Sequence, residues 1–279
     1  ITLICGLIGT IVGSFEIIFY FETFLTYLGI IIAPFAGVAM AEEFMEQGKH
    51  VLCEKPVAFT KKESEELYQL AKEKHLILLE AVKTAYCPGF QQLINIAQSG
   101  KIGEIRDVEA CFTRLADSSS RERTDANYGG SFLEFGSYTL LPIFKLLGTN
   151  YKEVTFHSLK DETGVDVYTK MQLSYENGMA LGKMGVGVKS EGQLVIAGTK
   201  GYILAESPWW LTKKFVVRYE NPSIIETYEP SFQGDGLRYE ISEFVSQING
   251  YSKNGYKLTE EEAVAMAEVT EKFMEFKKK

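Results

Sequence analysis

Glu54-Lys55-Pro56 places a carboxylate and an ammonium group directly after a short apolar run of strand type, residues 50–53. Pro56 has no N–H to donate to a sheet, so the strand is expected to end there. Ligands of open α/β sheets bind at the carboxyl ends of the strands. Lys55 is therefore a candidate for acid–base chemistry, although an arbitrary lysine is more often a solvated loop residue.

The residues around Lys55 form a longer motif. Residues 48–56, Gly-Lys-His-Val-Leu-Cys-Glu-Lys-Pro, resemble the signature of the Gfo/Idh/MocA oxidoreductases, the glucose–fructose oxidoreductase and inositol dehydrogenase family. In that family the lysine is catalytic and its loop borders the nicotinamide. The resemblance implies NAD or NADP as cofactor, a catalytic and substrate-binding role for Lys55, and cofactor contacts from Glu54, Lys55 and Pro56.

A second motif lies at residues 129–138, Gly-Gly-Ser-Phe-Leu-Glu-Phe-Gly-Ser-Tyr. It resembles the family segment whose final tyrosine or histidine is catalytic, and Tyr138 falls on that position. Glu134 stands where the family has aspartate and is one methylene longer. The resemblance implies that Glu134 and Tyr138 contact substrate. Without it, Tyr138 would be read as a core aromatic, because the chain has 15 tyrosines.

The implied reaction moves a hydride between nicotinamide and a carbinol carbon of a sugar, cyclitol or related diol. Tyr138, with an ordinary pKa of about 10, is a weak base on its own. We expect the Lys55 ammonium to lower that pKa, which makes Tyr138 the proton acceptor and Lys55 its partner. The opposite assignment, with Lys55 as the base, stays open. The alternative function is a non-catalytic dinucleotide-binding or regulatory protein.

The first residues carry part of a dinucleotide fingerprint. Residues 1–8 are typical of a buried strand, and the glycines after it suit a turn where backbone approaches a pyrophosphate. The resemblance assigns cofactor contacts to Gly6, Gly9, Thr10 and Pro34. Ile11 occupies the position of the second glycine, and this departure favours the non-catalytic alternative.

The N-terminal segment is short for a Rossmann-type domain. Only 54 residues precede Lys55, whereas each βαβ unit takes about 30 residues, so one strand–helix pair is missing. Either the domain is shortened or the sequence omits segments; we favour omission, because a sheet lacking a strand would expose apolar faces. Residues 23–41 carry no charge, but Pro34 and the absence of basic flanking residues argue against a membrane span.

The sequence as a whole predicts two domains, a dinucleotide-binding domain at 1–82 and a substrate and dimerisation domain at 83–279. The fold class is an α/β Rossmann-type domain followed by an α+β domain with a large, mostly antiparallel open sheet. Alternating residues at 165–175 and 182–188 flank the hairpin signal Asn177-Gly178. Helices are expected at residues 36–47, 60–74, 88–98, 237–249 and 260–277.

Composition restricts the partners. A net charge of −8 argues against a nucleic-acid surface. The four cysteines form no CxxC pair and the three histidines have no metal-ligand spacing, which favours free thiols in a reducing cytoplasm and predicts no metal site. The flat strands at 165–175 and 182–188 predict a homodimer, or a dimer of dimers, because a monomer rarely exposes so large an apolar face.

Overall fold

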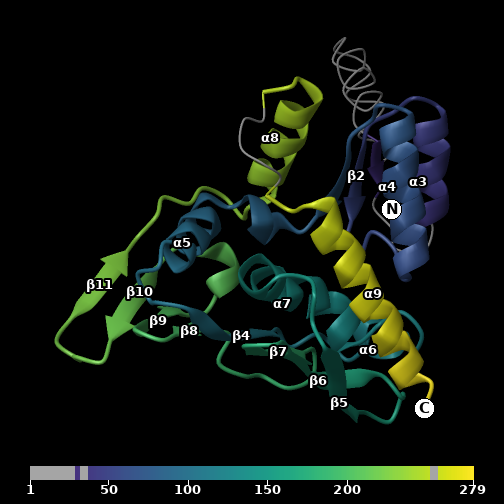
Figure 1. Cartoon of the computed structure of the whole chain (residues 1–279). Helices are drawn as coiled ribbons and strands as arrows, with labels where there is room; N and C mark the ends of the chain where they lie inside the picture. The colour runs from purple at the N-terminus through teal and green to yellow at the C-terminus, as the bar shows by residue number, and fades with distance from the viewer. Residues whose placement is uncertain (1–28, 32–36, 252–256) are drawn as a thin grey trace.

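The computed structural model describes residues 29–31, 37–251 and 257–279 (Figure 1). The predictions for the first strand, the glycine turn and Pro34 therefore lie outside the described residues, as does the question of a missing strand–helix pair. The N-terminal sheet has three parallel strands in the order β1 (Gly29–Ile31), β2 (Val51–Glu54) and β3 (Leu78–Ala81). The crossover helices are α3 (Gly37–Glu46) and α4 (Lys61–Glu73).

The ends of these helices follow the sequence signals. Thr60 caps α4 by accepting from the Glu63 N–H, while the Glu63 carboxylate accepts from the Thr60 N–H. This capping box satisfies two backbone donors that the first turn leaves without helical partners. Gly48 follows α3 with φ of 74°, a left-handed conformation that favours glycine. Both predicted helices are confirmed.

The chain then continues into the second part of the molecule. Its next elements are η1 (Lys83–Tyr86), α5 (Pro88–Gln98), β4 (Ile105–Thr113), α6 (Arg121–Thr124) and α7 (Ser131–Leu147), of which β4 is an inner strand of the large sheet. Proline at the first position of α5 matches the prediction, since that position needs no N–H donor. The polar segment 115–128 contains the single turn of α6.

The second sheet has eight strands in the order β11-β10-β9-β8-β4-β7-β6-β5. Every neighbouring pair is antiparallel except β4 with β7, so the predicted mostly antiparallel open sheet is confirmed. The strands after β4 are β5 (Glu153–Lys160), β6 (Asp166–Ser174), β7 (Met179–Gly185), β8 (Leu194–Gly198), β9 (Gly201–Ala205), β10 (Phe215–Tyr219) and β11 (Ile225–Tyr228), with the short η2 (Trp209–Leu211) before β10.

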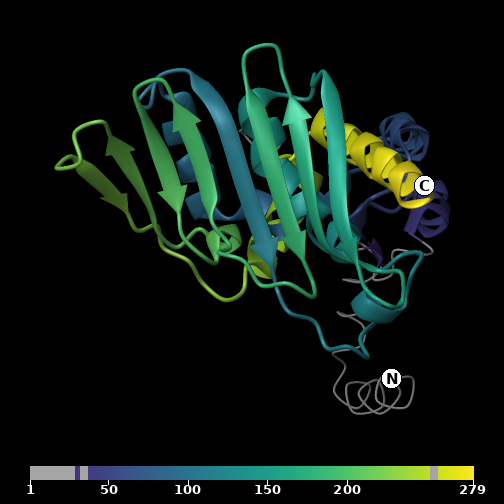
Figure 2. The ribbon, with the colours of Figure 1, turned by 90° about the horizontal axis from the view of Figure 1, so that it is seen from below.

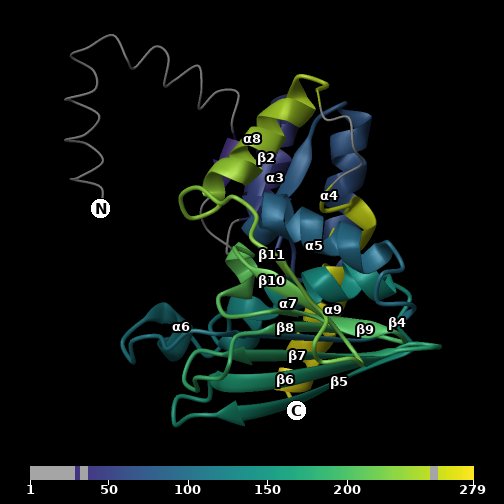
Figure 3. The same cartoon turned by 90° about the vertical axis from the view of Figure 1, so that its left-hand side faces the viewer.

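Helices of the same chain cover one face of this sheet. Met171 and Leu173 of β6 are buried beneath them, whereas Lys170 and Gln172 alternate onto the other face and are exposed. Figure 2, from below, shows the uncovered face of the strands toward the viewer with the helices behind. Figure 3 shows the sheet edge-on, then the layer with α5 and α7, then the N-terminal part of the molecule.

The last two helices, α8 (Leu237–Ile248) and α9 (Glu260–Lys277), return to the N-terminal part. α8 packs on η1, and α9 lies between α4 and α7 (Figure 1). The division at residue 82 stays a prediction, and the end of the chain contacts both sides of it. Among the described helices, none combines the length and apolar character needed to cross a bilayer.

Candidate active site

Lys55 lies just beyond the carboxyl end of β2 and reaches the first turn of α7. Its Nζ donates to the backbone oxygen of Glu134 at 2.6 Å and lies 3.5 Å from the Glu134 carboxylate. The two side chains are only 12% and 21% exposed. The two motifs, 79 residues apart in the chain, therefore meet through these residues.

Tyr138 follows Glu134 by four residues, so helical periodicity puts both side chains on one face of α7. The Lys55 ammonium lies 5.7 Å from the centre of the Tyr138 ring. Phe112 of β4 packs edge-on against that ring at 5.0 Å, and Tyr138 is half-buried. The structure thus brings together Lys55, Glu134 and Tyr138, the three predicted substrate-binding residues.

These residues line a cavity of about 330 Å³. Its lining comes from the segment after β2, from α7 and from the polar segment 115–128. The full lining is Glu54, Lys55, Pro56, Phe59, Arg121, Tyr128, Leu133, Glu134 and Tyr138. Cavities of a few hundred Å³ with a few polar groups are typical of small-molecule sites.

Four lining residues were not identified from the sequence. Phe59 and Tyr128 form a ring pair with centres 5.4 Å apart, and Arg121 and Leu133 complete the lining. Arg121 and Tyr128 belong to the polar segment 115–128, whose composition suits solvated surface and substrate contact equally well. Both reach the cavity, although no periodic pattern in that segment could have indicated which side chains do so.

The electrostatics differ from expectation at Tyr138. We expected Lys55 to lower the pKa of Tyr138, but burial raises it above its ordinary value, and the carboxylates of Glu54 and Glu240 raise it further. Tyr138 is therefore a neutral phenol at neutral pH. Glu54 itself has a raised pKa because it is partly buried, and the Lys55 ammonium opposes that shift.

A fully buried carboxylate lies behind the loop that carries Lys55. Glu80 of β3 accepts from the Val57 N–H at 3.2 Å, while its second oxygen has no partner among the described residues. Burial raises the pKa of Glu80 to about 7. No role for Glu80 was predicted from the sequence; a glutamate in the apolar run Leu-Ile-Leu-Leu-Glu-Ala, residues 76–81, was the available signal.

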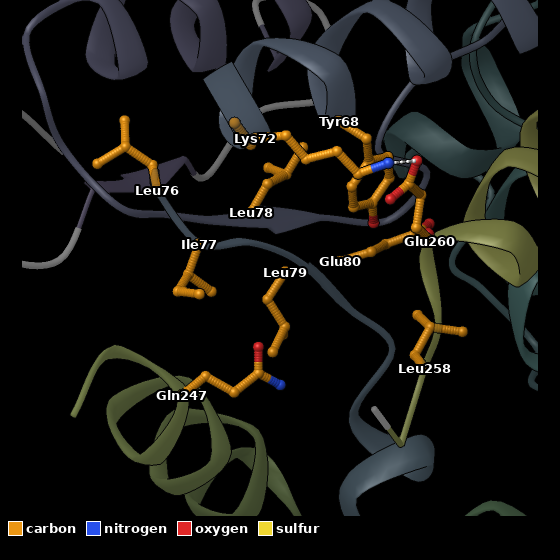
Figure 4. Close-up of a pocket in the computed structure, with 11 residues that line it drawn as sticks. Tyr68, Lys72, Leu76, Ile77, Leu78, Leu79, Glu80, Gln247, Leu258 and Glu260 are labelled. Carbon is orange, nitrogen blue, oxygen red and sulfur yellow. Dashed lines mark hydrogen bonds and ion pairs between the residues drawn. The ribbon is translucent and has the colours of Figure 1, made fainter. Parts of the chain in front are cut away.

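A second cavity, of about 200 Å³, runs along β3 between α4, α8 and the start of α9. Figure 4 shows the ion pair of Lys72 with Glu260 at one side of it and the Gln247 amide at another; the pair spans 2.7 Å. None of the site residues predicted from the motifs lines this cavity. It is therefore separate from the candidate active site.

Two family models match successive parts of the chain. Residues 25–82 match "Oxidoreductase family, NAD-binding Rossmann fold", and residues 90–204 match "GFO/IDH/MocA C-terminal domain". This chain belongs to the Gfo/Idh/MocA oxidoreductase family. The resemblance drawn from residues 48–56 and 129–138 is thereby confirmed.

Relatives of this Gfo/Idh/MocA protein include named dehydrogenases. It is 30% identical over 195 residues to a trans-1,2-dihydrobenzene-1,2-diol dehydrogenase of Sus scrofa, covering 69% of this chain and 57% of that protein. It is 29% identical over 236 residues to a scyllo-inositol 2-dehydrogenase (NADP(+)) of Bacillus subtilis, covering 82% and 70%. The chain thus spans little more than half the length of the pig enzyme.

The fold also matches solved structures. A 3-ketoreductase from Actinomadura kijaniata, solved in complex with TDP-benzene and NADP, superposes with a TM-score of 0.70 at 20% identity, covering 86% of this chain and 74% of that one. At this identity the match supports the fold alone. Of the predicted cofactor-binding residues, Glu54, Lys55 and Pro56 line the cavity, and Gly6, Gly9, Thr10 and Pro34 lie outside the described residues.

Proposed function

We propose that this Gfo/Idh/MocA protein is an NAD(P)-dependent oxidoreductase that transfers a hydride between nicotinamide and a carbinol carbon of a sugar, cyclitol or related diol. The observation that carries the proposal is the meeting of Lys55 and Tyr138, from separate motifs, in one cavity beyond a parallel strand's carboxyl end. That edge of an open sheet is where dinucleotides bind.

In this proposal the cavity of about 330 Å³ receives the reacting end of a dinucleotide together with a small polyol. Glu54, Lys55 and Pro56 would border the nicotinamide, and Gly6 and Gly9 would hold the pyrophosphate. When bound, NAD or NADP accepts or supplies the hydride. One experiment tests both the choice between NAD and NADP and the identity of the substrate.

Tyr138 donates or accepts the proton that accompanies the hydride, and Lys55 stabilises the charge that develops on the reacting oxygen. In carbonyl reduction, neutral Tyr138 donates its phenolic proton to the oxygen that gains negative charge, and the Lys55 ammonium hydrogen-bonds the same oxygen. Alcohol oxidation is the reverse step: the tyrosinate form of Tyr138, stabilised by the Lys55 ammonium, accepts the hydroxyl proton and becomes the neutral phenol. The Glu134 carboxylate, 3.5 Å from Lys55 Nζ, orients the ammonium and accepts from a second substrate hydroxyl.

Cofactor reduction with a panel of substrates tests this function. The purified protein is incubated with NAD+ or NADP+ and with scyllo-inositol, trans-dihydrodiols and aldoses, and absorbance of the reduced nicotinamide is followed. We expect turnover with at least one polyol and a clear preference for one cofactor. Tight binding of NAD(P)H without turnover on any compound would instead favour a dinucleotide-binding or regulatory protein, as Ile11 in the glycine turn suggests.

We place the enzyme in the cytoplasm as a homodimer or dimer of dimers. The described cysteines Cys53, Cys87 and Cys111 are free and buried, which suits a reducing compartment. On the uncovered face of the large sheet, Val195 and Val216 lie directly beside Leu204 in neighbouring strands. This apolar row supports pairing of two sheets face to face across a twofold axis.

Light scattering at micromolar concentration tests the assembly. We expect a mass at least twice the 31.3 kDa of one chain, with about 1,600 Å² or more buried per pair. Leu204→Lys should lower the mass toward that of a monomer, whereas Lys214→Glu, on an exposed position outside the apolar row, should not. A wild-type protein that scatters as a monomer contradicts the dimer.

A further inference from the structure

Asp166, the first residue of β6, is a buried carboxylate directly beneath the N-terminus of α7. Its side chain is fully buried, and its Oδ2 accepts from the Phe132 N–H at 3.0 Å and the Ser131 hydroxyl at 2.9 Å. A carboxylate at a helix N-terminus satisfies free N–H groups and opposes the positive end of the helix dipole. Asp166 therefore fixes the first turn of the helix that carries Glu134 and Tyr138.

The space at this position is tightly filled. Gly130, the residue before α7, has φ of 106°, and a Cβ built there would lie 2.0 Å from Asp166 Oδ1. The backbone of Gly130 can approach the carboxylate so closely only because it has no side chain. The Gly130 oxygen in turn accepts from the Glu134 N–H at 3.2 Å, which links the capped end directly to the residue that contacts Lys55.

Lys277, in the last turn of α9, neutralises this carboxylate. Its Nζ lies 3.4 Å from Asp166 Oδ1, and the two side chains are 10% and 1% exposed. Asp166 Oδ1 has no hydrogen-bond donor in the described part of the chain, so Lys277 provides the opposite charge that a buried carboxylate needs. Lys277 Nζ also donates to the Gly129 oxygen at 3.3 Å.

The same helix packs on the first turn of α7. Phe273 of α9 stacks on Phe132 with ring centres 4.1 Å apart, and both rings are buried. This apolar contact lies one turn from the Asp166–Lys277 pair along α9. The start of α7 is thus held by a charge pair and a ring pair that both come from the end of the chain.

α9 also contacts the helix that follows the Lys55 loop. The Lys61 N–H, at the first residue of α4, donates to Glu271 Oε2 at 3.0 Å, and the Lys61 ammonium lies 2.9 Å from Glu268 Oε2. One helix therefore contacts the start of α4, six residues beyond Lys55, and the start of α7, which carries Tyr138. The segment after Lys55 and the helix that carries Tyr138 therefore both contact α9.

We propose that Asp166 and Lys277 are positioning residues: through their buried pair, α9 fixes the first turn of α7 and so sets the place of Tyr138 relative to Lys55. This inference rests on the proposed oxidoreductase function. Neither residue touches the cavity that contains Lys55, so their effect on the reaction passes through the helix alone. A misplacement of about 1 Å between catalytic groups costs as much as 10²-fold in rate.

Steady-state kinetics of Lys277 variants test the proposal. Lys277→Met keeps the aliphatic stem but removes the charge; we expect kcat to fall roughly tenfold or more while KM for the cofactor stays within about twofold. Lys277→Arg restores the pair and should recover most of the kcat. Lys278→Met is the matched control, because Lys278 is the neighbouring, exposed lysine at the same helix end and should leave kcat unchanged.

Hydrogen exchange provides a readout that does not depend on activity. Amides of residues 131–135 should exchange faster in Lys277→Met than in the wild type or in Lys278→Met. Asp166→Asn keeps an oxygen for the Phe132 N–H and serves as the second variant if Lys277→Met does not fold. Circular dichroism and the melting temperature establish that the compared proteins are folded.

The outcomes separate this inference from the proposed function. A folded Lys277→Met or Asp166→Asn variant with wild-type kcat and unchanged exchange at residues 131–135 overturns the positioning role. An equal loss in Lys278→Met overturns it as well, because the effect would then not depend on the buried pair. A wild-type protein that transfers no hydride overturns the proposed function, and the exchange experiment still decides whether the pair fixes α7.

Discussion

Lys55→Met removes the ammonium group and keeps most of the aliphatic stem. The variant loses the 2.6 Å hydrogen bond to the Glu134 oxygen and the 3.5 Å ion pair with its carboxylate. A general acid–base or charge-stabilising group contributes about 10²- to 10⁴-fold to the rate. We therefore expect kcat to fall by at least about 10²-fold, which corresponds to roughly 2.7 kcal/mol of transition-state stabilisation.

Stability should change less than activity. A hydrogen bond to a charged group contributes about 1.5–3 kcal/mol to folding, and because the pair is partly exposed we expect a loss of about 1–2 kcal/mol in the free energy of unfolding. That loss leaves a domain of ordinary stability folded. Lys62→Met is the control, because Lys62 is 82% exposed and pairs with Glu66 on the surface of α4.

The assay follows formation of NAD(P)H at saturating polyol and measures nucleotide affinity separately by fluorescence. We expect cofactor affinity within about threefold of wild type, because the ammonium stabilises the transition state and not the bound ground state. A Lys55→Met enzyme with kcat within threefold of wild type would refute the catalytic role. A loss of activity equal to that of Lys62→Met would show that the ammonium at position 55 contributes no more to the reaction than a surface lysine does.

Three further outcomes follow from the same structure. Tyr138→Phe should lower kcat by about 10²-fold or more, and since burial raises the pKa of Tyr138, the wild-type pH–rate profile should show no ionisation of this phenol below about pH 10. Between pH 4.5 and about 7, Glu80 binds a proton on folding because burial raises its pKa from 4.5 to about 7. The free energy of unfolding, measured by urea titration, should therefore fall as pH rises across that interval. Glu80→Gln should reduce this dependence of the free energy of unfolding on pH. Gly130→Ala places a Cβ 2.0 Å from a carboxylate oxygen, so this variant should have a much lower melting temperature than Gly148→Ala. Gly148 also has a positive φ, of 80°, but no atom within 4 Å of its added Cβ, and its substitution should lower the free energy of unfolding by about 1 kcal/mol. Equal melting temperatures would contradict the crowding at the start of α7.

The two catalytic candidates could be identified from the sequence because each lies in a long local motif. Lys55 is preceded by a strand-type run and followed by a capping box, and Tyr138 closes a glycine-rich segment. Their meeting in one cavity is what the structure adds. The helices at 88–98, 237–249 and 260–277 were also predicted with nearly the observed ends, because proline, glycine and capping residues mark those ends.

Other features of the site have no local signal. Arg121 and Tyr128 come from a polar segment whose residues would look the same on a solvated surface, and only the tertiary fold turns them toward the cavity. The raised pKa of Tyr138 depends on burial and on carboxylates from distant segments, whereas the sequence drew attention to Lys55 alone. The charge pair of Asp166 with Lys277 joins residues of unremarkable local context across the fold.

The contact between Lys61 and Glu271 joins residues 210 positions apart, and it has a consequence for how the protein is made. A ribosome delivers Lys55 and Tyr138 long before α9, and at roughly 5–20 residues per second the wait lasts from several seconds to about half a minute. During that interval the nascent chain holds the segments of Lys55 and Tyr138 without the helix that contacts each of them. The proposed activity should therefore arise only after residues 260–277 have left the exit tunnel.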